Sequence, residues 1–255
     1  MSRRIALVIE YEGTNYRGFQ LQASHATVQG ALEQALNRFT GESIRIRGAS
    51  RTDSGAHAYG QVVDFATNAD RPLGRFAKAL NYYLPADIRV QAAHEMAADF
   101  HSRRDACSRE YRYQIVNRES PSPIRRNSHH WITQQLNVEK MSAAAQDFIG
   151  IHDFRPFGSG HPKDKSAVRQ VTRWDVTKKD DTIVVVCEAN GFLRHQIRRA
   201  NGLLVEIGRE RQPDDSVRKV LENRMPVGIE WTSLPARGLC LVKVNYNDFW
   251  SKVRT

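Results

Sequence analysis

The chain is organised around the polar, turn-rich stretch Gly48-Ala49-Ser50-Arg51-Thr52-Asp53-Ser54-Gly55-Ala56-His57-Ala58-Tyr59-Gly60. Its single acid is Asp53, and Arg51 lies two residues before it. A carboxylate beside Ser and Gly ordinarily accepts hydrogen bonds from nearby backbone N–H groups, so the stretch alone favours a turn or cap role for Asp53. A chemical role depends on what the rest of the chain supplies.

The segments around this stretch follow a βαββαβ order in the first part of the chain. Apolar runs and alternation predict strands over 5–10, 44–46, 61–66 and 88–92. Apolar residues at helical spacing predict a helix that Thr27 caps and Gly41 ends. They predict a second helix that begins at Asp70 and Pro72 and ends at Pro85. This order is that of the split βαβ, or ferredoxin-like, unit.

The second part of the chain repeats the element order without detectable sequence similarity. The patterns predict strands over 111–115, 171–177, 183–188 and 239–246. They predict helices from Asn137 to Gly150, over 193–208 and, as a short insertion, over 214–223, and a long loop over 151–170. We therefore predict an α+β protein with two similar halves, 1–105 and 106–255.

The composition favours a polyanionic partner. The net charge is +10, and arginine, which binds phosphate bidentately and stacks on bases, greatly outnumbers lysine. Genome composition would give the same arginine bias. Three distant cysteines without zinc spacing indicate reduced thiols in a cytosolic protein. We expect no membrane segment, metal site or nucleotide cofactor, because no long apolar run, HxxxH, P-loop or GxGxxG occurs.

Two elements of the second half carry candidate functional groups. Arg198 lies at the edge of the buried stripe of its helix, where a carboxylate such as Asp53 would offset the cost of burying a cation. Tyr111 and Tyr113 share one face of a strand and are either core residues or rings that stack on a base. Basic clusters that favour a nucleic-acid groove contain Arg45, Arg47, Arg51, Arg103, Arg104, Arg125, Arg126, Arg194, Arg198 and Arg199. For Arg199 we prefer a solvated helix face.

Motifs along nearly the whole chain resemble those of the tRNA pseudouridine synthase A family. The stretch 50–58 is similar to the catalytic GRTDxGVHA motif, and 11–22 is similar to the YDGxxYxGFQxQ opening. Further resemblances, in the same order as in the family, are LPADIRV at 84–90, FHSRRDACSREYRY at 100–113, GIHDF at 150–154, FLRHQIRRANG at 192–202 and PARGL at 235–239. The departures are Ser50 for Gly, Ala56 for Val, Gln196-Ile197 for Met-Val, and Arg199-Ala200-Asn201 for an apolar run.

The resemblance implies two RRM-like halves that form the pseudouridine synthase fold, with the active-site cleft between them. It implies Asp53 as the nucleophile and Arg51 as the cation of the same motif. It implies Tyr111 as the tyrosine that contacts the target base, Arg198 as the arginine that pairs with the aspartate, and Leu239 as the leucine near the base. The implied substrate is the tRNA anticodon stem-loop at uridines 38, 39 and 40, and the implied assembly is a homodimer.

Pseudouridine formation would need no cofactor, because it is an isomerisation without net redox change. The N1–C1′ bond breaks, the uracil turns, and C5 joins C1′. Arg51 and Arg198 would keep the Asp53 carboxylate ionised as a nucleophile, and the target base would leave the stack. We expect a cytoplasmic enzyme. The alternatives are a non-catalytic tRNA-binding protein, a paralogue that modifies other RNA uridines, and an aspartyl-nucleophile hydrolase.

Overall fold

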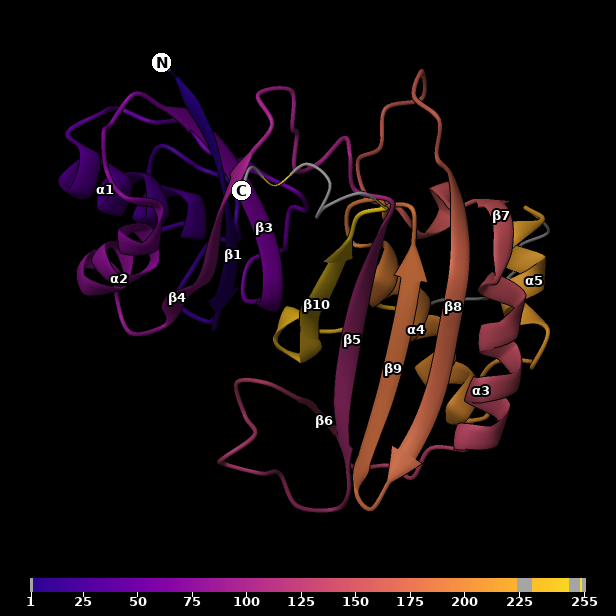
Figure 1. Cartoon of the computed structure of the whole chain (residues 1–255). Coiled ribbons are helices and arrows are strands. Elements are labelled where there is room, and N and C mark those ends of the chain that lie inside the picture. The colour runs from indigo at the N-terminus through magenta and orange to yellow at the C-terminus, as the bar shows by residue number, and fades with distance from the viewer. Residues whose placement is uncertain (1, 224–230, 248–252, 254–255) are drawn as a thin grey trace. The chain divides into compact units, whose positions relative to one another are not determined.

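The structure is a computed structural model that describes residues 2–223, 231–247 and 253 (Figure 1). The chain divides into two compact units. The first unit contains the chain up to Arg109 together with the segment that starts at Leu241, and the second unit is Glu110–Cys240. Both are α+β with mostly antiparallel strands, as the sequence predicts. Within the described ranges, no helix is long and apolar enough to cross a membrane.

The first unit confirms the predicted βαββαβ order. Its elements are β1 Arg3–Tyr11, α1 Val28–Thr40, β2 Arg47–Gly48, β3 His57–Thr67, α2 Leu73–Tyr83 and β4 Ile88–Met96. Strand β1 lies between β4 and β3 and is antiparallel to both, while β2 pairs with β3. The two helices lie on one side of these strands in Figure 1. The ring of Phe76 on α2 packs between the helices and the sheet. Its centre is 5.1 Å from the ring centre of Phe39 of α1 and 6.1 Å from that of Phe65 of β3.

The capping chemistry of α1 is as the sequence predicts. The Thr27 hydroxyl accepts a hydrogen bond from Gly30 N at 3.2 Å, and Gly41 ends the helix at a φ of 78°. Only glycine adopts that conformation without steric cost. Helix α2 begins at Leu73, with Pro72 as its N-cap, rather than at Asp70, and no side chain caps it.

The predicted strand over 44–46 does not form, although its half-exposed alternation is confirmed, since Arg45 is exposed between the two isoleucines. Ile44 and Ile46 are buried, and only Arg47–Gly48 pairs with β3. The reason is that side chains of α1 take the place of a partner strand. Ile46 N donates to Glu33 Oε1 at 3.1 Å, and Ile46 O accepts from Gln29 Nε2 at 3.3 Å. The backbone is thus satisfied without a longer strand.

The second unit keeps the predicted order and adds elements to it. Its strands are β5 Ser108–Asn117 (which begins in the first unit), β6 His130–Ile132, β7 Gly150–Asp153, β8 Val168–Lys179, β9 Thr182–Ala189 and the start of β10 Leu239–Asn245. Its helices are α3 Val138–Ala145, α4 Gln196–Gly208 and α5 Ser216–Leu221, with the short 3₁₀ helices Gln146–Phe148, Arg155–Phe157 and Ala236–Gly238. The strand order is β5-β9-β8-β7, and β6 runs parallel to β5.

Three predictions for this unit need correction. The predicted loop over 151–170 contains most of β7, a 3₁₀ helix and the start of β8. Gly150 does not close α3, which ends at Ala145, but begins β7. Helix α4 begins at Gln196 rather than 193, because the residue before it, His195, has a φ of 62°. The predicted cap of α3 is confirmed, since Lys140 N donates to Asn137 Oδ1 at 3.1 Å.

The core of the second unit is aromatic. The ring of the fully buried Trp174 of β8 packs at 4.4 Å from the ring of Phe148, and Phe154 and Phe157 also pack against the ring of Phe148. Helix α3 packs on α4 and β8 beside this cluster. The indole N–H of Trp174 donates to Asn201 Oδ1 at 3.2 Å, so one of the polar departures from the family pattern lies in the core.

His130 on β6 makes the stability of this unit depend on pH. Burial, together with the nearby cations Arg237 and Arg209, lowers the pKa of His130 to about 4. The folded state therefore binds the proton less well than the unfolded state, whose histidine pKa is about 6.5. The contribution of His130 to the free energy of unfolding is therefore highest above about pH 6.5 and falls as the pH drops toward 4.

We predict that His130→Gln weakens this pH dependence. One histidine can contribute at most about 1.4 kcal/mol per pH unit to the slope. The measurement is urea unfolding at pH 7 and pH 5, with the exposed His25→Gln as the matched control. His94 and His129, whose pKa values burial also lowers, remain in both variants. An unchanged loss of stability between the two pH values in His130→Gln would contradict the assignment.

Candidate active site

Asp53 lies on the loop between β2 and β3 of the first unit. Ala56 N donates to Asp53 O at 3.1 Å and closes a tight turn, in which Gly55 has a φ of 80°. The side chain of Asp53 is half-buried, whereas that of Arg51 is exposed. The turn chemistry that the sequence indicates is therefore present, and it holds the backbone around Asp53 in one conformation.

The loop 11–20 packs against the Asp53 loop and forms hydrogen bonds with it at several positions. Gly13 N donates to His57 Nδ1 at 3.0 Å, Phe19 N donates to Thr52 O at 3.2 Å, and Gly55 N donates to Tyr16 O at 3.3 Å. The hydroxyl groups of Tyr11 and Thr52 are 2.8 Å apart and share a hydrogen bond. The opening motif of the sequence and the aspartate motif thus form one packed structure.

Two glycines permit this contact. A Cβ on Gly13 would lie 1.9 Å from Ala56 O, closer than any real contact. A Cβ on Gly18 would lie 2.8 Å from Thr52 O, and the φ of Gly18 is 87°. Any other residue at either position would push the two loops apart.

The opposite side of the Asp53 loop is fixed to β3. The side chain of Gln61, which is fully buried, accepts from Ser50 N at 3.1 Å and donates to Ser50 O at 2.6 Å. Ala49 N donates to Val62 O at 2.8 Å. The loop is therefore held from both sides, which pre-organises the residues it carries.

In the second unit, Tyr111 and Tyr113 share the buried face of β5, as the alternation predicts. Their exposed fractions are 4% and 0%. Tyr111 packs edge-to-face on Phe192, with 5.5 Å between the ring centres. The Tyr113 hydroxyl donates to Pro235 O at 2.7 Å, and burial raises the pKa of this phenol above its usual range. Tyr113 is therefore a fixed neutral donor in the core.

Arg198, on α4, is half-buried, and the segment 234–239 holds it. Arg198 Nε donates to Leu234 O at 2.6 Å, and Leu234 N donates back to Arg198 O at 3.1 Å. A Cβ on Gly238 would meet the Tyr113 ring at 2.7 Å, so this segment also packs on β5. Leu239, which is 5% exposed, follows directly and begins β10. The structure thus connects Tyr113, Arg198 and the segment that carries Leu239.

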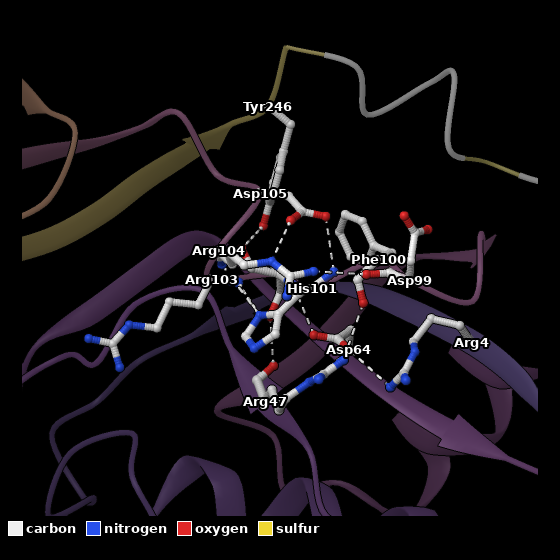
Figure 2. A network of polar contacts seen from close by, with 11 residues as sticks. Arg4, Arg47, Asp64, Asp99, Phe100, His101, Arg103, Arg104, Asp105 and Tyr246 are labelled. Atoms are coloured by element: carbon white, nitrogen blue, oxygen red, sulfur yellow. Dashed lines mark hydrogen bonds and ion pairs between the residues drawn. The ribbon is translucent and has the colours of Figure 1, made fainter.

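A second polar network in the first unit surrounds Asp64 of β3 (Figure 2). The Asp64 carboxylate is fully buried and accepts from Arg4 at 3.2 Å, from Arg47 Nε at 3.1 Å and from Ser102 N at 2.9 Å. Two guanidinium groups and a backbone N–H compensate the buried charge. Arg47 therefore has a structural partner that the sequence alone did not indicate.

This network fixes the turn around Arg103 and Arg104. His101 Nδ1 accepts from the N–H groups of both residues at 3.3 Å, and the Tyr246 hydroxyl donates to Ser102 O at 2.6 Å. The Arg103 side chain is exposed and points away from the network in Figure 2. Arg104 is exposed but lies 3.3 Å from the Asp105 carboxylate. The turn presents basic side chains on a fixed backbone.

Arg109 joins this turn to the stretch that carries Asp53. It is only 7% exposed, and its guanidinium donates to Arg103 O at 2.6 Å and to Ala49 O at 3.2 Å. Sequence reasoning missed this role. The available signal was the alternation of β5, which places Arg109 on the same buried face as Tyr111.

The remaining predicted RNA-binding arginines differ in their surroundings. Arg45 pairs with Glu33 at 3.0 Å, and Arg194 is exposed. Arg199 is half-buried, with its guanidinium 5.8 Å from the centre of the Trp231 ring, so the preferred interpretation of a solvated face is wrong. Whether any of these arginines binds RNA stays a prediction. So does the pairing of Arg198 with Asp53, which belong to different units.

A hollow of 640 Å³ in the first unit is lined in part by Arg4, Arg45 and Arg47. All three guanidinium groups already contact carboxylates, those of Asp64 and Glu33. The charge of the lining is therefore largely compensated within the protein, and the hollow has little remaining attraction for an anion.

Comparison with known proteins identifies the class. The family model described as tRNA pseudouridine synthase matches residues 7–104 and 144–247, which include Asp53, Arg198 and Leu239. The chain therefore belongs to the tRNA pseudouridine synthase family, a class of isomerases.

Several relatives align over almost the whole chain. It is 39% identical over 244 residues to "tRNA pseudouridine synthase A" of Acetivibrio thermocellus, and 39% identical over 246 residues to that of Thermoanaerobacter sp. (strain X514). It is 38% identical over 246 residues to "tRNA pseudouridine synthase A 2" of Clostridium perfringens. Each alignment covers 96% of this chain and the whole of the relative.

Proposed function

We propose that this chain isomerises uridine to pseudouridine at positions 38, 39 and 40 of the tRNA anticodon stem-loop. The observation that carries the proposal is the Asp53 loop, which hydrogen bonds to the loop 11–20 hold in place. The chain that contains it aligns over almost its whole length with proteins named tRNA pseudouridine synthase A. The net charge of +10 supports a polyanionic substrate. The exposed Arg103 turn offers cations for RNA phosphates.

In this proposal Asp53 is the nucleophile. It is half-buried on a fixed loop, and a carboxylate held in this way needs no rearrangement to meet a target atom. The N1–C1′ bond of the uridine breaks, the freed uracil turns, and a C5–C1′ bond forms. The proton that leaves C5 goes to a base, and N1 gains one, so the reaction balances without a co-reactant. This balance holds whether Asp53 first attacks the sugar, attacks the base or removes a proton from the sugar.

Tyr111, Arg198 and Leu239 complete the proposed site. Tyr111 stacks against the target base after it leaves the stem, and a tyrosine hydroxyl could accept the C5 proton. Arg198, held by Leu234 O, pairs with the Asp53 carboxylate. Leu239 supplies an apolar contact to the base, and Arg51 is a second cation of the aspartate motif.

We predict that Asp53→Asn abolishes the reaction. The change keeps the shape of the side chain but removes the nucleophile, so the rate should fall by about 10³-fold or more. The assay is tritium release from C5-labelled uridine in a tRNA transcript, with the exposed Asp164→Asn as control. Retained activity in Asp53→Asn would sink the nucleophile assignment. A wild-type chain that binds tRNA without releasing tritium would indicate the non-catalytic alternative.

We predict that Arg198→Ala lowers turnover more than it weakens binding. An arginine that acts on the carboxylate should reduce kcat by about 100-fold while the Kd for tRNA changes about threefold or less. Single-turnover rates and filter binding measure the two quantities, and Arg218→Ala, an exposed arginine on α5 outside the predicted RNA-binding clusters, is the control. Equal losses in kcat and affinity would instead indicate that Arg198 contacts a phosphate.

We also propose a cytoplasmic homodimer, in keeping with the resemblance to the family. The mass of one chain is 29.1 kDa, so light scattering at micromolar concentration should give about twice this value. A measured mass equal to that of one chain would contradict the dimer.

A further inference from the structure

We propose that Asp87 is a positioning residue for Asp53, and that it acts through Tyr16 and the loop 11–20. This inference rests on the proposed catalytic role of Asp53. Asp87 lies in the short turn between α2 and β4, before the first residue of that strand. It carries no role in the proposed chemistry. Its hydrogen bonds nevertheless all go to the loop 11–20, which packs against the aspartate motif.

Asp87 anchors three residues of that loop. The Tyr16 hydroxyl donates to Asp87 Oδ1 at 2.5 Å, Asn15 Nδ2 donates to Oδ2 at 3.3 Å, and Glu12 N donates to Asp87 O at 2.9 Å. A hydroxyl bond to a carboxylate is short and about twice as strong as a neutral one. Burial and the bond to Asp87 raise the pKa of Tyr16, which keeps its hydroxyl a donor.

Tyr16 in turn contacts both residues that follow Asp53. Its carbonyl oxygen accepts from Gly55 N and from Ser54 Oγ, each at 3.3 Å. Two residues on, Gly18 packs so closely that a Cβ there would lie 3.3 Å from Asp53 C. A displacement of Tyr16 is therefore passed directly to the backbone that carries Asp53.

Tyr16 connects Asp87, through its hydroxyl group, to the Asp53 loop, through its carbonyl group. Tyr16 is 8% exposed, so its ring is fixed by packing and only the hydroxyl end depends on Asp87. Without the carboxylate, the loop loses its charged anchor but keeps its backbone bonds to Thr52 and His57. We expect a small displacement of Asp53 rather than unfolding. A displacement of about 1 Å at a reacting group can cost about 100-fold in rate.

The test compares Asp87→Asn, Tyr16→Phe and the double variant. Asp70→Asn is the matched control, because Asp70 is an exposed aspartate that precedes α2 whereas Asp87 follows it. Each single variant should lower kcat by about 10- to 100-fold and leave the KM for tRNA within about twofold. The double variant should be no slower than the slower single variant, because Tyr16→Phe removes the Tyr16–Asp87 hydrogen bond and Asp87→Asn removes only the charge that strengthens that same bond.

The outcomes separate this inference from the proposed function. Activity in Asp53→Asn would overturn the proposed function. An inactive Asp53→Asn together with wild-type kcat in Asp87→Asn and Tyr16→Phe would overturn only the positioning role. Additive losses in the double variant, or a rise in KM equal to the fall in kcat, would also contradict it. If Asp87→Asn does not fold, Tyr16→Phe, which keeps the buried ring, decides the question alone.

Discussion

The close approach of two backbones is the constraint on which the first unit depends. Gly13 and Gly18 let the loop 11–20 lie directly against the Asp53 loop, at distances that no Cβ would permit. The same loop also starts α1, because Gly18 O accepts from Val28 N at 3.3 Å and Phe19 O accepts from Gln29 N at 2.9 Å. One segment therefore sets the entry of a helix and the conformation of the candidate catalytic loop together.

Long periodic elements and their caps could be predicted from the sequence, and short ones could not. The Thr27 cap, the Gly41 stop and the buried tyrosine face of β5 all follow from local rules. Strands β6 and β7 have three and four residues, too few for a period, and they depend on partners far along the chain. The predicted strand over 44–46 does not form for a related reason. Side chains of α1, which lie far away in sequence, form the hydrogen bonds of the Ile46 backbone.

The partners of the charged residues could not be predicted from the sequence. Arg45, Arg47 and Arg103 look alike in sequence, yet Arg47 contacts the fully buried Asp64 while Arg103 is exposed. Burying Asp64 without its cations would be costly, so part of the arginine excess maintains the fold rather than binding a substrate. The net charge of +10 therefore overstates the number of arginines available to RNA.

The departures from the family pattern in α4 find a structural explanation by the same logic. Gln196 and Asn201 are buried, and each satisfies a distinct donor: Gln196 Oε1 accepts from Leu193 N at 2.8 Å, and Asn201 Oδ1 accepts from the Trp174 indole. The first bond stabilises the start of α4 beside the left-handed His195, and the second ties the helix to the aromatic core. Arg198 lies between the two. The polar substitutions thus fix the helix that presents the arginine, and they leave the proposed chemistry of the site unchanged.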